Sequence, residues 1–265
     1  MVAAVVLVMP LAAACGSGGG TSGVAAPSGG IAPEVAGELV GRWAHYDVVA
    51  YEDEVMRTLI ISYGFNDFSV VDGELVDATT FCYSEQLTDQ PIDISLSDGA
   101  TQAIRPIPTP VTVTVTDGMI RLQRPPTPTP VGIRLDDPAN DALPSDPADP
   151  RIVDDDGDGK PGITVGIVVG DGFSGELYLT RREIFSYDVE LSGPGRLDGV
   201  VTDESEQLVI GATDPAFLTS KAQWTQYPDL GRSPIYLRRV EGDWDCERLR
   251  SSRNDLFPPN PSIDW

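Results

Sequence analysis

Asp-Gly pairs between short runs of Val, Ile and Thr leave this chain few options other than antiparallel β-structure. Residues 111–116 alternate apolar and polar side chains, Asp117-Gly118 follows directly, and the chain continues into a second candidate strand at residues 119–123. Alternation with period two is typical of a strand, and Asp-Gly suits the tight hairpin turn whose two central residues need positive φ. Asp72-Gly73 and Asp171-Gly172 stand in the same position between other runs. The pattern predicts consecutive antiparallel strands.

Further candidate strands share a richness in Val, Ile, Tyr and Phe; they are residues 43–50, 57–63, 78–83, 184–191, 199–202, 207–211 and 235–240. Together with the hairpins they make about ten short strands, a number typical of antiparallel barrels and sandwiches. The expected fold class is therefore all-β, an antiparallel barrel or sandwich.

One short helix is expected near the C-terminus. Asp214 can cap it, Pro215 suits its first position, and Pro228 would stop it. Its buried stripe would consist of Phe217, Leu218, Ala222 and Trp224. An irregular loop is the alternative.

Composition divides the chain into four parts. Residues 1–14 are interpreted as a signal peptide, and residues 15–37, rich in Gly, Ser, Ala and Pro, as a flexible tether. Residues 38–250 are expected to form one β-domain that carries a proline-rich and acidic insertion at 106–162. Residues 251–265 are left as a C-terminal tail.

The N-terminus predicts export. Residues 2–11 are almost all apolar but too few to cross a bilayer as a helix, which is typical of a cleaved signal. Leu11-Ala12-Ala13-Ala14-Cys15 resembles the lipobox of bacterial lipoproteins. The resemblance implies acylation of Cys15 and anchoring to a bacterial membrane, and Gly16 resembles a signal for the outer membrane. An ordinary secretory signal with an incidental cysteine is the alternative.

Export also determines what the other two cysteines are expected to do. In an oxidising compartment Cys82 and Cys246 should form a disulfide, with two buried free thiols as the alternative. The chain carries 41 acidic and 18 basic residues, a formal net charge of -23. Such a charge repels nucleic acid and anionic lipid heads. We therefore expect no nucleic-acid partner and membrane contact through the acyl chains alone.

One segment has the pattern of a cation site. Residues 154–162 read Asp-Asp-Asp-Gly-Asp-Gly-Lys-Pro-Gly. Asp154, Asp156 and Asp158 can direct three carboxylates to one centre, and the carbonyl of Lys160 can add a fourth oxygen, a ligand set that favours Ca²⁺. The segment resembles the calcium loops of EF-hands and of integrin-like FG-GAP repeats. The wider resemblance is to proteobacterial surface lipoproteins with one such loop in a β-rich domain, which implies no particular activity.

The loop lacks part of the ligand set of both families. Val165 and Gly162 stand where those loops carry a further acid. Water or a distant acid, namely Asp146, Asp149 or Asp171, would have to complete the coordination. An acidic turn that stays solvated without an ion is the alternative.

Residues in the first and last predicted strands suggest a protein that carries a small ligand. Gly41-Arg42-Trp43 opens the first strand, and Arg238 and Arg239 lie in the last. This resembles the lipocalin arrangement, in which a G-x-W on the first strand meets a late arginine beneath an up-and-down barrel. The resemblance implies a cavity for a small apolar ligand; Trp43 as an ordinary core residue is the alternative.

Catalysis has little support in the sequence. His45 is the only histidine, it lies in the first expected strand, and no G-x-S-x-G segment occurs. We therefore expect no enzyme. The expected function is a lipid-anchored extracytoplasmic β-domain with a structural calcium-type loop and a structural or interaction role. The alternatives are a lipocalin-like carrier of a small apolar ligand and, third, a carboxylate-dependent hydrolase.

Overall fold

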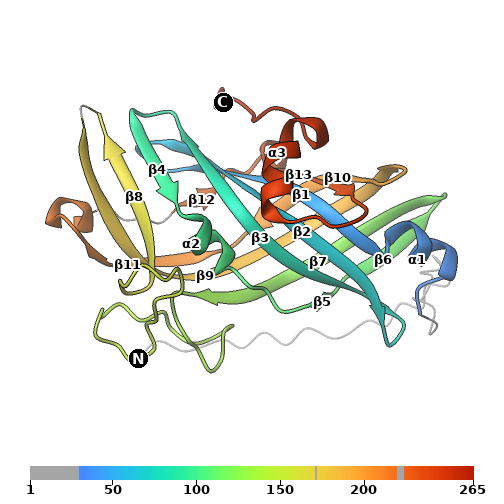
Figure 1. Ribbon diagram of the computed structural model, residues 1–265, viewed down its shortest axis with the longest axis horizontal. Helices are drawn as coiled ribbons and strands as arrows, with labels where there is room; N and C mark the ends of the chain where they lie inside the picture. Colours follow the sequence, from blue (N-terminus) through green and yellow to red (C-terminus); the bar gives the residue numbers. More distant parts are fainter. Residues whose placement is uncertain (1–29, 171, 220–223) are drawn as a thin grey trace, which may run out of the picture.

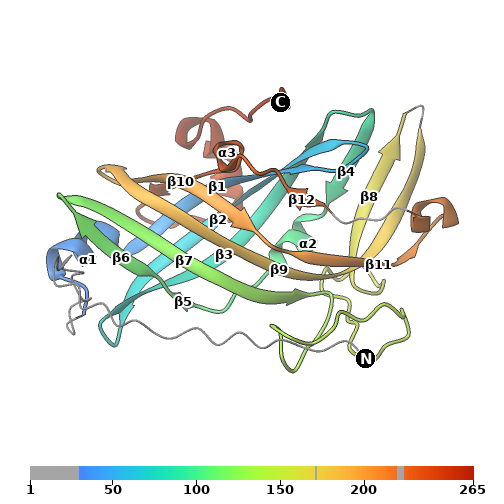
Figure 2. The ribbon, with the colours of Figure 1, turned by 180° about the vertical axis from the view of Figure 1, so that it is seen from behind.

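The computed structural model describes residues 30–170, 172–219 and 224–265. Within them, thirteen strands form one sheet that curls into a half-barrel, and all strand pairs are antiparallel (Figures 1 and 2). The all-β antiparallel class expected from the sequence is confirmed. Cys15, the signal peptide, Asp171 and Ala222 lie outside the described residues.

The elements follow one another with short connections, except for a long loop at residues 132–162. The helices are α1 (Pro33–Leu39), α2 (Asp98–Gln102) and α3 (Cys246–Leu256), with 3-10 helices η1 (Pro215–Thr219) and η2 (Leu230–Arg232). The strands are β1 (Gly41–Glu52), β2 (Arg57–Val71), β3 (Glu74–Thr88), β4 (Ile92–Leu96), β5 (Thr109–Pro110), β6 (Thr112–Thr116), β7 (Met119–Val131), β8 (Ile163–Val169), β9 (Phe173–Gly193), β10 (Arg196–Asp203), β11 (Glu206–Ala212), β12 (Thr225–Gln226) and β13 (Pro234–Arg239).

The hairpin turns have the backbone that Asp-Gly predicts. Asp72 and Asp117 have φ of 52° and 53°, and Gly73 and Gly118 follow with φ of 88° and 81°. Positive φ at both central residues matches the twist of the flanking strands. The β2–β3 and β6–β7 hairpins are therefore confirmed.

Strand β9 organises the sheet because it pairs with four others. On one edge it pairs with β8 over residues 173–179 and with β7 over 181–190. On the other edge it pairs with β11 over 177–182 and with β10 over 185–193. The sheet continues from β10 through β13, β1 and β2 to β3. One long strand thus belongs to both ends of the half-barrel.

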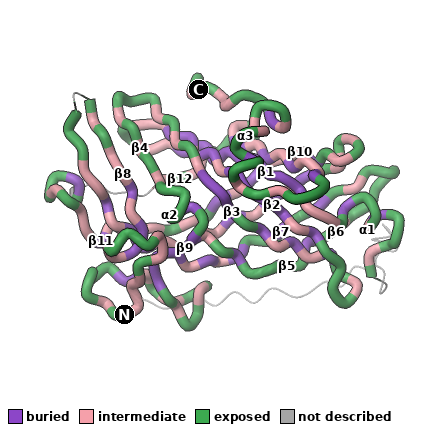
Figure 3. The backbone as a smooth tube through the Cα atoms, in the orientation of Figure 1, coloured by how far each residue is buried: buried purple, intermediate pink, exposed green. Residues whose placement is uncertain are grey.

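Strand β1 is buried on both faces (Figure 3). Trp43, Val49 and Tyr51 belong to the cluster inside the half-barrel, whereas Ala44, Tyr46 and Val48 pack on its outside beneath Leu249 and Phe257 of the C-terminal segment. Successive side chains of a strand point to opposite faces, so one strand supplies both layers. The outer layer is fixed by the Cys82–Cys246 disulfide, which confirms the predicted pairing.

Three boundaries differ from the sequence expectation. The tether drawn at 15–37 ends too late, because Val35 and Leu39, four residues apart on α1, are buried. The insertion drawn at 106–162 begins too early, because β7 pairs with β9. Its prolines are tolerated since residues 124–131 have no strand partner on their other edge among the described residues. The tail drawn at 251–265 begins inside α3.

The expected helix after Asp214 is a 3-10 turn rather than an α-helix. Asp214 accepts a hydrogen bond from the N–H of Ala216 at 2.8 Å, and η1 starts at Pro215 as expected. Phe217 is buried, but Leu218 is half exposed and Trp224 lies beyond η1, so the expected stripe is wrong. The α-helix of this region is α3, capped by Asp245, which accepts from Arg248 N at 2.8 Å.

Candidate functional site: a cavity in the half-barrel

A cavity of about 740 Å³ lies between β1–β4, α2, β8 and β9. Alternate residues of β8 line it, Ile163, Val165 and Ile167 among them, as do Ile92 and Ile94 of β4. Residues two apart on a strand share a face, so each strand presents an apolar stripe to the space between them. Cavities of roughly 300–1,000 Å³ with mainly apolar walls are typical of small-molecule sites.

The opposite end of the half-barrel is filled. Trp43 is fully buried there and donates its Nε1–H to the carbonyl of Leu39 at the end of α1, at 2.8 Å. The Arg239 guanidinium lies 5.4 Å from the centre of the Trp43 ring and donates to the carbonyls of Val40 and Gly37. The arginine that meets the G-x-W tryptophan is therefore Arg239. Arg238 instead pairs with Asp198.

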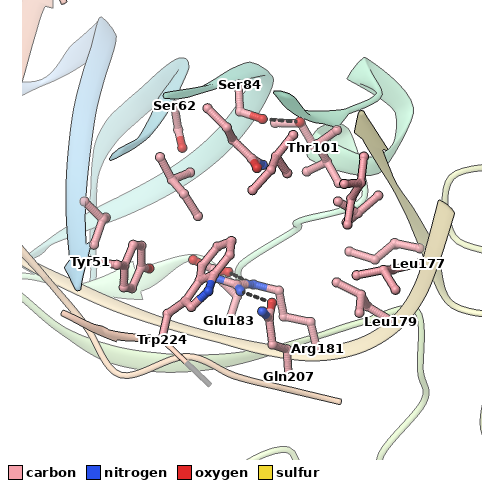
Figure 4. A pocket seen from close by; sticks show the side chains of 18 of the residues that line it. Tyr51, Ser62, Ser84, Thr101, Leu177, Leu179, Arg181, Glu183, Gln207 and Trp224 are labelled. Carbon is pink, nitrogen blue, oxygen red and sulfur yellow. Dashed lines mark hydrogen bonds and ion pairs between the residues drawn. The ribbon is translucent and has the colours of Figure 1, made fainter. Parts of the chain in front are cut away.

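A polar cluster interrupts the apolar wall of the cavity on one side (Figure 4). Arg181 donates from Nε to Glu183 Oε2 at 2.5 Å and from Nη1 to Gln207 Oε1 at 2.8 Å. Tyr51 donates its hydroxyl to Asp203 Oδ2 at 2.7 Å. Burial lowers the pKa of Arg181, but the charges of Glu183, Tyr51 and Asp203 outweigh it, so that pKa is raised and the guanidinium stays charged. We call Asp47, Tyr51, Arg181, Glu183 and Asp203 the cavity cluster.

Asp47 is the least satisfied member of the cavity cluster. It lines the cavity, yet only 8 % of its surface is exposed. Burial raises the pKa of its carboxyl well above the ordinary value, and the charges of Glu183 and Asp203 raise it further. Its nearest basic group is Nε2 of His45, 3.7 Å from Oδ1. Burial lowers the pKa of His45 to about 4, so that imidazole is neutral.

A second polar cluster lies deeper and does not reach the cavity. Asp77 accepts hydrogen bonds from Asn66 at 2.9 and 3.0 Å, from Thr79 at 3.0 Å and from Tyr187 at 2.9 Å. Arg124 lies 3.3 Å from Asp77, and both side chains are 0 % exposed. We call these five residues the deep cluster. Its many partners make it part of the core rather than a site.

Sequence reasoning missed the cavity cluster, although a signal was present. In β9 the residues Leu177, Leu179, Arg181, Glu183 and Phe185 follow one another at every second position, and all five line the cavity. On this strand face two charged side chains stand between aliphatic and aromatic ones, which indicates charged groups inside an apolar space.

The predicted calcium loop brings its three acids together. Ligand oxygens of Asp154, Asp156 and Asp158 all lie within 4.8 Å of one another. Asp154 accepts from the N–H groups of Gly157 and Gly159, and these backbone donors, that of Gly159 first, lower the pKa of its carboxyl. Asp156 Oδ1 is buried without a hydrogen-bond partner among the described residues. These three carboxylates fit a cation.

Two of the distant acids expected to complete the coordination do not join these three. The carbonyl of Lys160 stays a predicted ligand, while its ammonium lies 2.6 Å from Glu176 and 3.5 Å from Asp158. Asp149 pairs with Arg151 at 2.8 Å, and Asp146 accepts from the N–H of Ala148. Both therefore stay outside the group of acids found in the described residues. Calcium binding stays a prediction.

Comparison with protein-family models, with curated proteins and with solved structures finds no match. Among the described residues, no helix has the length and apolar character needed to cross a membrane.

Proposed function

We propose that the protein is a carrier that holds a small ligand with an apolar body in the cavity between β4, β8 and β9. The cavity of about 740 Å³ is the observation that carries this proposal. An unfilled apolar space costs stability, since its lining side chains lose packing contacts. A carrier gives that space a use that a purely structural domain lacks.

The closed end of the half-barrel supports the same function. Trp43, Arg239 and α1 fill and cover this end, where β1 begins at Gly41. Tyr51, near the other end of β1, faces the cavity. The residues 53–56 between β1 and β2 also line the cavity. A ligand would thus enter from the β1–β2 connection. The contact between Arg239 and Trp43 is the one that the lipocalin resemblance implies.

Export and anchoring remain part of the proposal. The Cys82–Cys246 disulfide is consistent with an oxidising compartment. Residue 31, where the tether joins the domain, donates its N–H to Gly73 at the β2–β3 turn. We propose acylation at Cys15 and attachment to the outer membrane, with the cavity directed away from the anchored end. Mass spectrometry of the mature N-terminus tests this: an unacylated Cys15 contradicts it.

A fluorescent apolar probe tests the carrier function. We expect N-phenylnaphthylamine to bind in a saturable way and Val165→Phe, which fills the cavity, to weaken binding about tenfold or more. Val168→Phe is the matched control, because Val168 lies on the same strand, is 40 % exposed and is not part of the cavity wall. Absence of saturable binding, or equal binding by Val165→Phe and Val168→Phe, would contradict the proposal.

A further inference from the structure

The charged side chains that line the cavity are mostly acidic. Asp47, Asp53, Glu54 and Glu183 line it, whereas Arg181 is the single basic residue among the described lining residues. Arg181 is already committed to Glu183 and Gln207. Asp203 adds a further carboxylate behind the Tyr51 hydroxyl. A ligand carboxylate or phosphate entering this space would meet several carboxyl groups and, among the described lining residues, no cation without an acidic partner.

Asp47 offers this cavity an acceptor with no competing donor. No hydrogen bond of its carboxyl to a described residue is present, and the His45 nitrogen at 3.7 Å is too distant for one. Because a buried carboxyl without a partner is unfavourable, a ligand donor that reaches Asp47 would remove that cost. The groups facing Asp47 are His45, Glu183 and Asp203, with Arg181 paired to Glu183.

Aromatic rings flank the same side of the cavity. The rings of Tyr51 and Trp224 lie 5.7 Å apart, and Figure 4 shows both on the same side of the cavity as Glu183, with Leu177 and Leu179 together on the other side. Aromatic faces attract ammonium groups, and the attraction strengthens away from water. The cavity therefore has a polar side suited to a cation and an apolar side suited to a hydrocarbon chain.

We propose that the ligand is an amphiphile whose polar end is an ammonium group, placed between Asp47 and Glu183 with its apolar chain against Leu177 and Leu179. This inference rests on the proposed carrier function and names its ligand class. The net charge of -23 would favour the approach of a cationic ligand to the protein as a whole.

Three probes with the same alkyl chain test the inference. Dodecylamine, dodecanol and dodecanoate compete with N-phenylnaphthylamine for the full-length protein at neutral pH, below the concentrations at which they form micelles. We expect dodecylamine to bind at least about tenfold more tightly than dodecanoate, with dodecanol between them, because one hydrogen bond to a charged group contributes that much. Equal or tighter binding of dodecanoate overturns the ammonium inference but leaves the carrier function standing. Binding of none of the three contradicts both.

A pair of matched variants locates the recognition. Asp47→Asn should weaken dodecylamine about tenfold and leave dodecanol unchanged. Asp93→Asn removes the same charge from β4, but on an exposed residue outside the cavity wall, and should change neither affinity. Equal loss in both variants would mean that only overall charge matters and would overturn the placement at Asp47. Circular dichroism checks folding; if Asp47→Asn does not fold, the ranking of the three probes by the unmodified protein decides.

Discussion

The deep cluster and the cavity cluster lie in the same half-barrel, and each holds one arginine, one tyrosine and at least one acid. In the deep cluster, Asp77 has Asn66, Thr79, Tyr187 and Arg124 around it and is closed off from solvent. In the cavity cluster, Asp47 has no donor within hydrogen-bond distance among the described residues. A carboxylate whose partners are complete supports the core, whereas one left open toward a cavity can recognise a ligand.

The largest difference is expected when the two aspartates receive the same substitution. Asp77→Asn leaves the Arg124 charge buried without its carboxylate and should lower the free energy of unfolding by about 3–5 kcal/mol. Asp47→Asn removes an uncompensated carboxyl and should leave the free energy of unfolding unchanged or raise it. Urea unfolding at neutral pH measures both. Similar losses in the two variants would break the distinction between the clusters.

Acidification should separate the effects of His45 and Asp47 on stability. The pKa of His45 is about 4 in the folded protein, below its ordinary value of 6.5. Between these two values the imidazole is protonated in the unfolded chain but neutral in the folded protein. His45 should therefore cost roughly 2 kcal/mol of stability between pH 7 and pH 5, a loss that His45→Gln removes.

The carboxyl of Asp47 should change the pH dependence of stability in the opposite direction to His45. The pKa of its carboxyl is raised in the folded protein, so its contribution to stability is present at low pH and is lost as the pH rises through that pKa. Asp47→Asn should therefore steepen the loss of stability on acidification. The measurement is the free energy of unfolding of the unmodified protein, His45→Gln and Asp47→Asn at pH 7 and pH 5. Equal pH dependence in all three would contradict the roles given to both His45 and Asp47.

Packing gives the third contrast, because one end of the half-barrel is full and the other is hollow. Val189 is fully buried in the filled interior, so Val189→Phe should cost about 1–3 kcal/mol of unfolding free energy. Val165 lines the cavity, so Val165→Phe has room and should cost less than about 1 kcal/mol. Thermal or urea unfolding compares them. A larger loss for Val165→Phe would indicate that the cavity is already filled by its own side chains.

The sequence predicts local pairing in this fold better than it predicts the site. Period-two runs and Asp-Gly turns place the β2–β3 and β6–β7 hairpins, because strand and turn lie within a few residues. The disulfide follows from the number of cysteines. The cavity depends on which distant strands meet: Asp77 and Arg124 belong to different hairpins, and β9 pairs with four strands. Such register is fixed by packing over the whole sheet.

The smallest expected effect concerns a third group of acids, in the surface loop before β8. Asp154, Asp156 and Asp158 converge there, and a divalent cation would relieve their repulsion. We expect Ca²⁺ at about ten times its Kd to stabilise the fold by roughly 1.4 kcal/mol. Asp154→Asn should abolish the effect and Asp136→Asn, an exposed acid outside the group, should not. A melting temperature that neither Ca²⁺ nor a chelator changes would contradict calcium binding by this loop.

A crystal structure of the protein grown with dodecylamine would show whether the cavity holds an ammonium group at Asp47. We expect one molecule in the cavity, its nitrogen within hydrogen-bond distance of Asp47 and its chain along Leu177 and Leu179, with β1 and β9 unmoved. A cavity that holds only water, or that has closed on its own side chains while the amine lies elsewhere, would contradict this expectation.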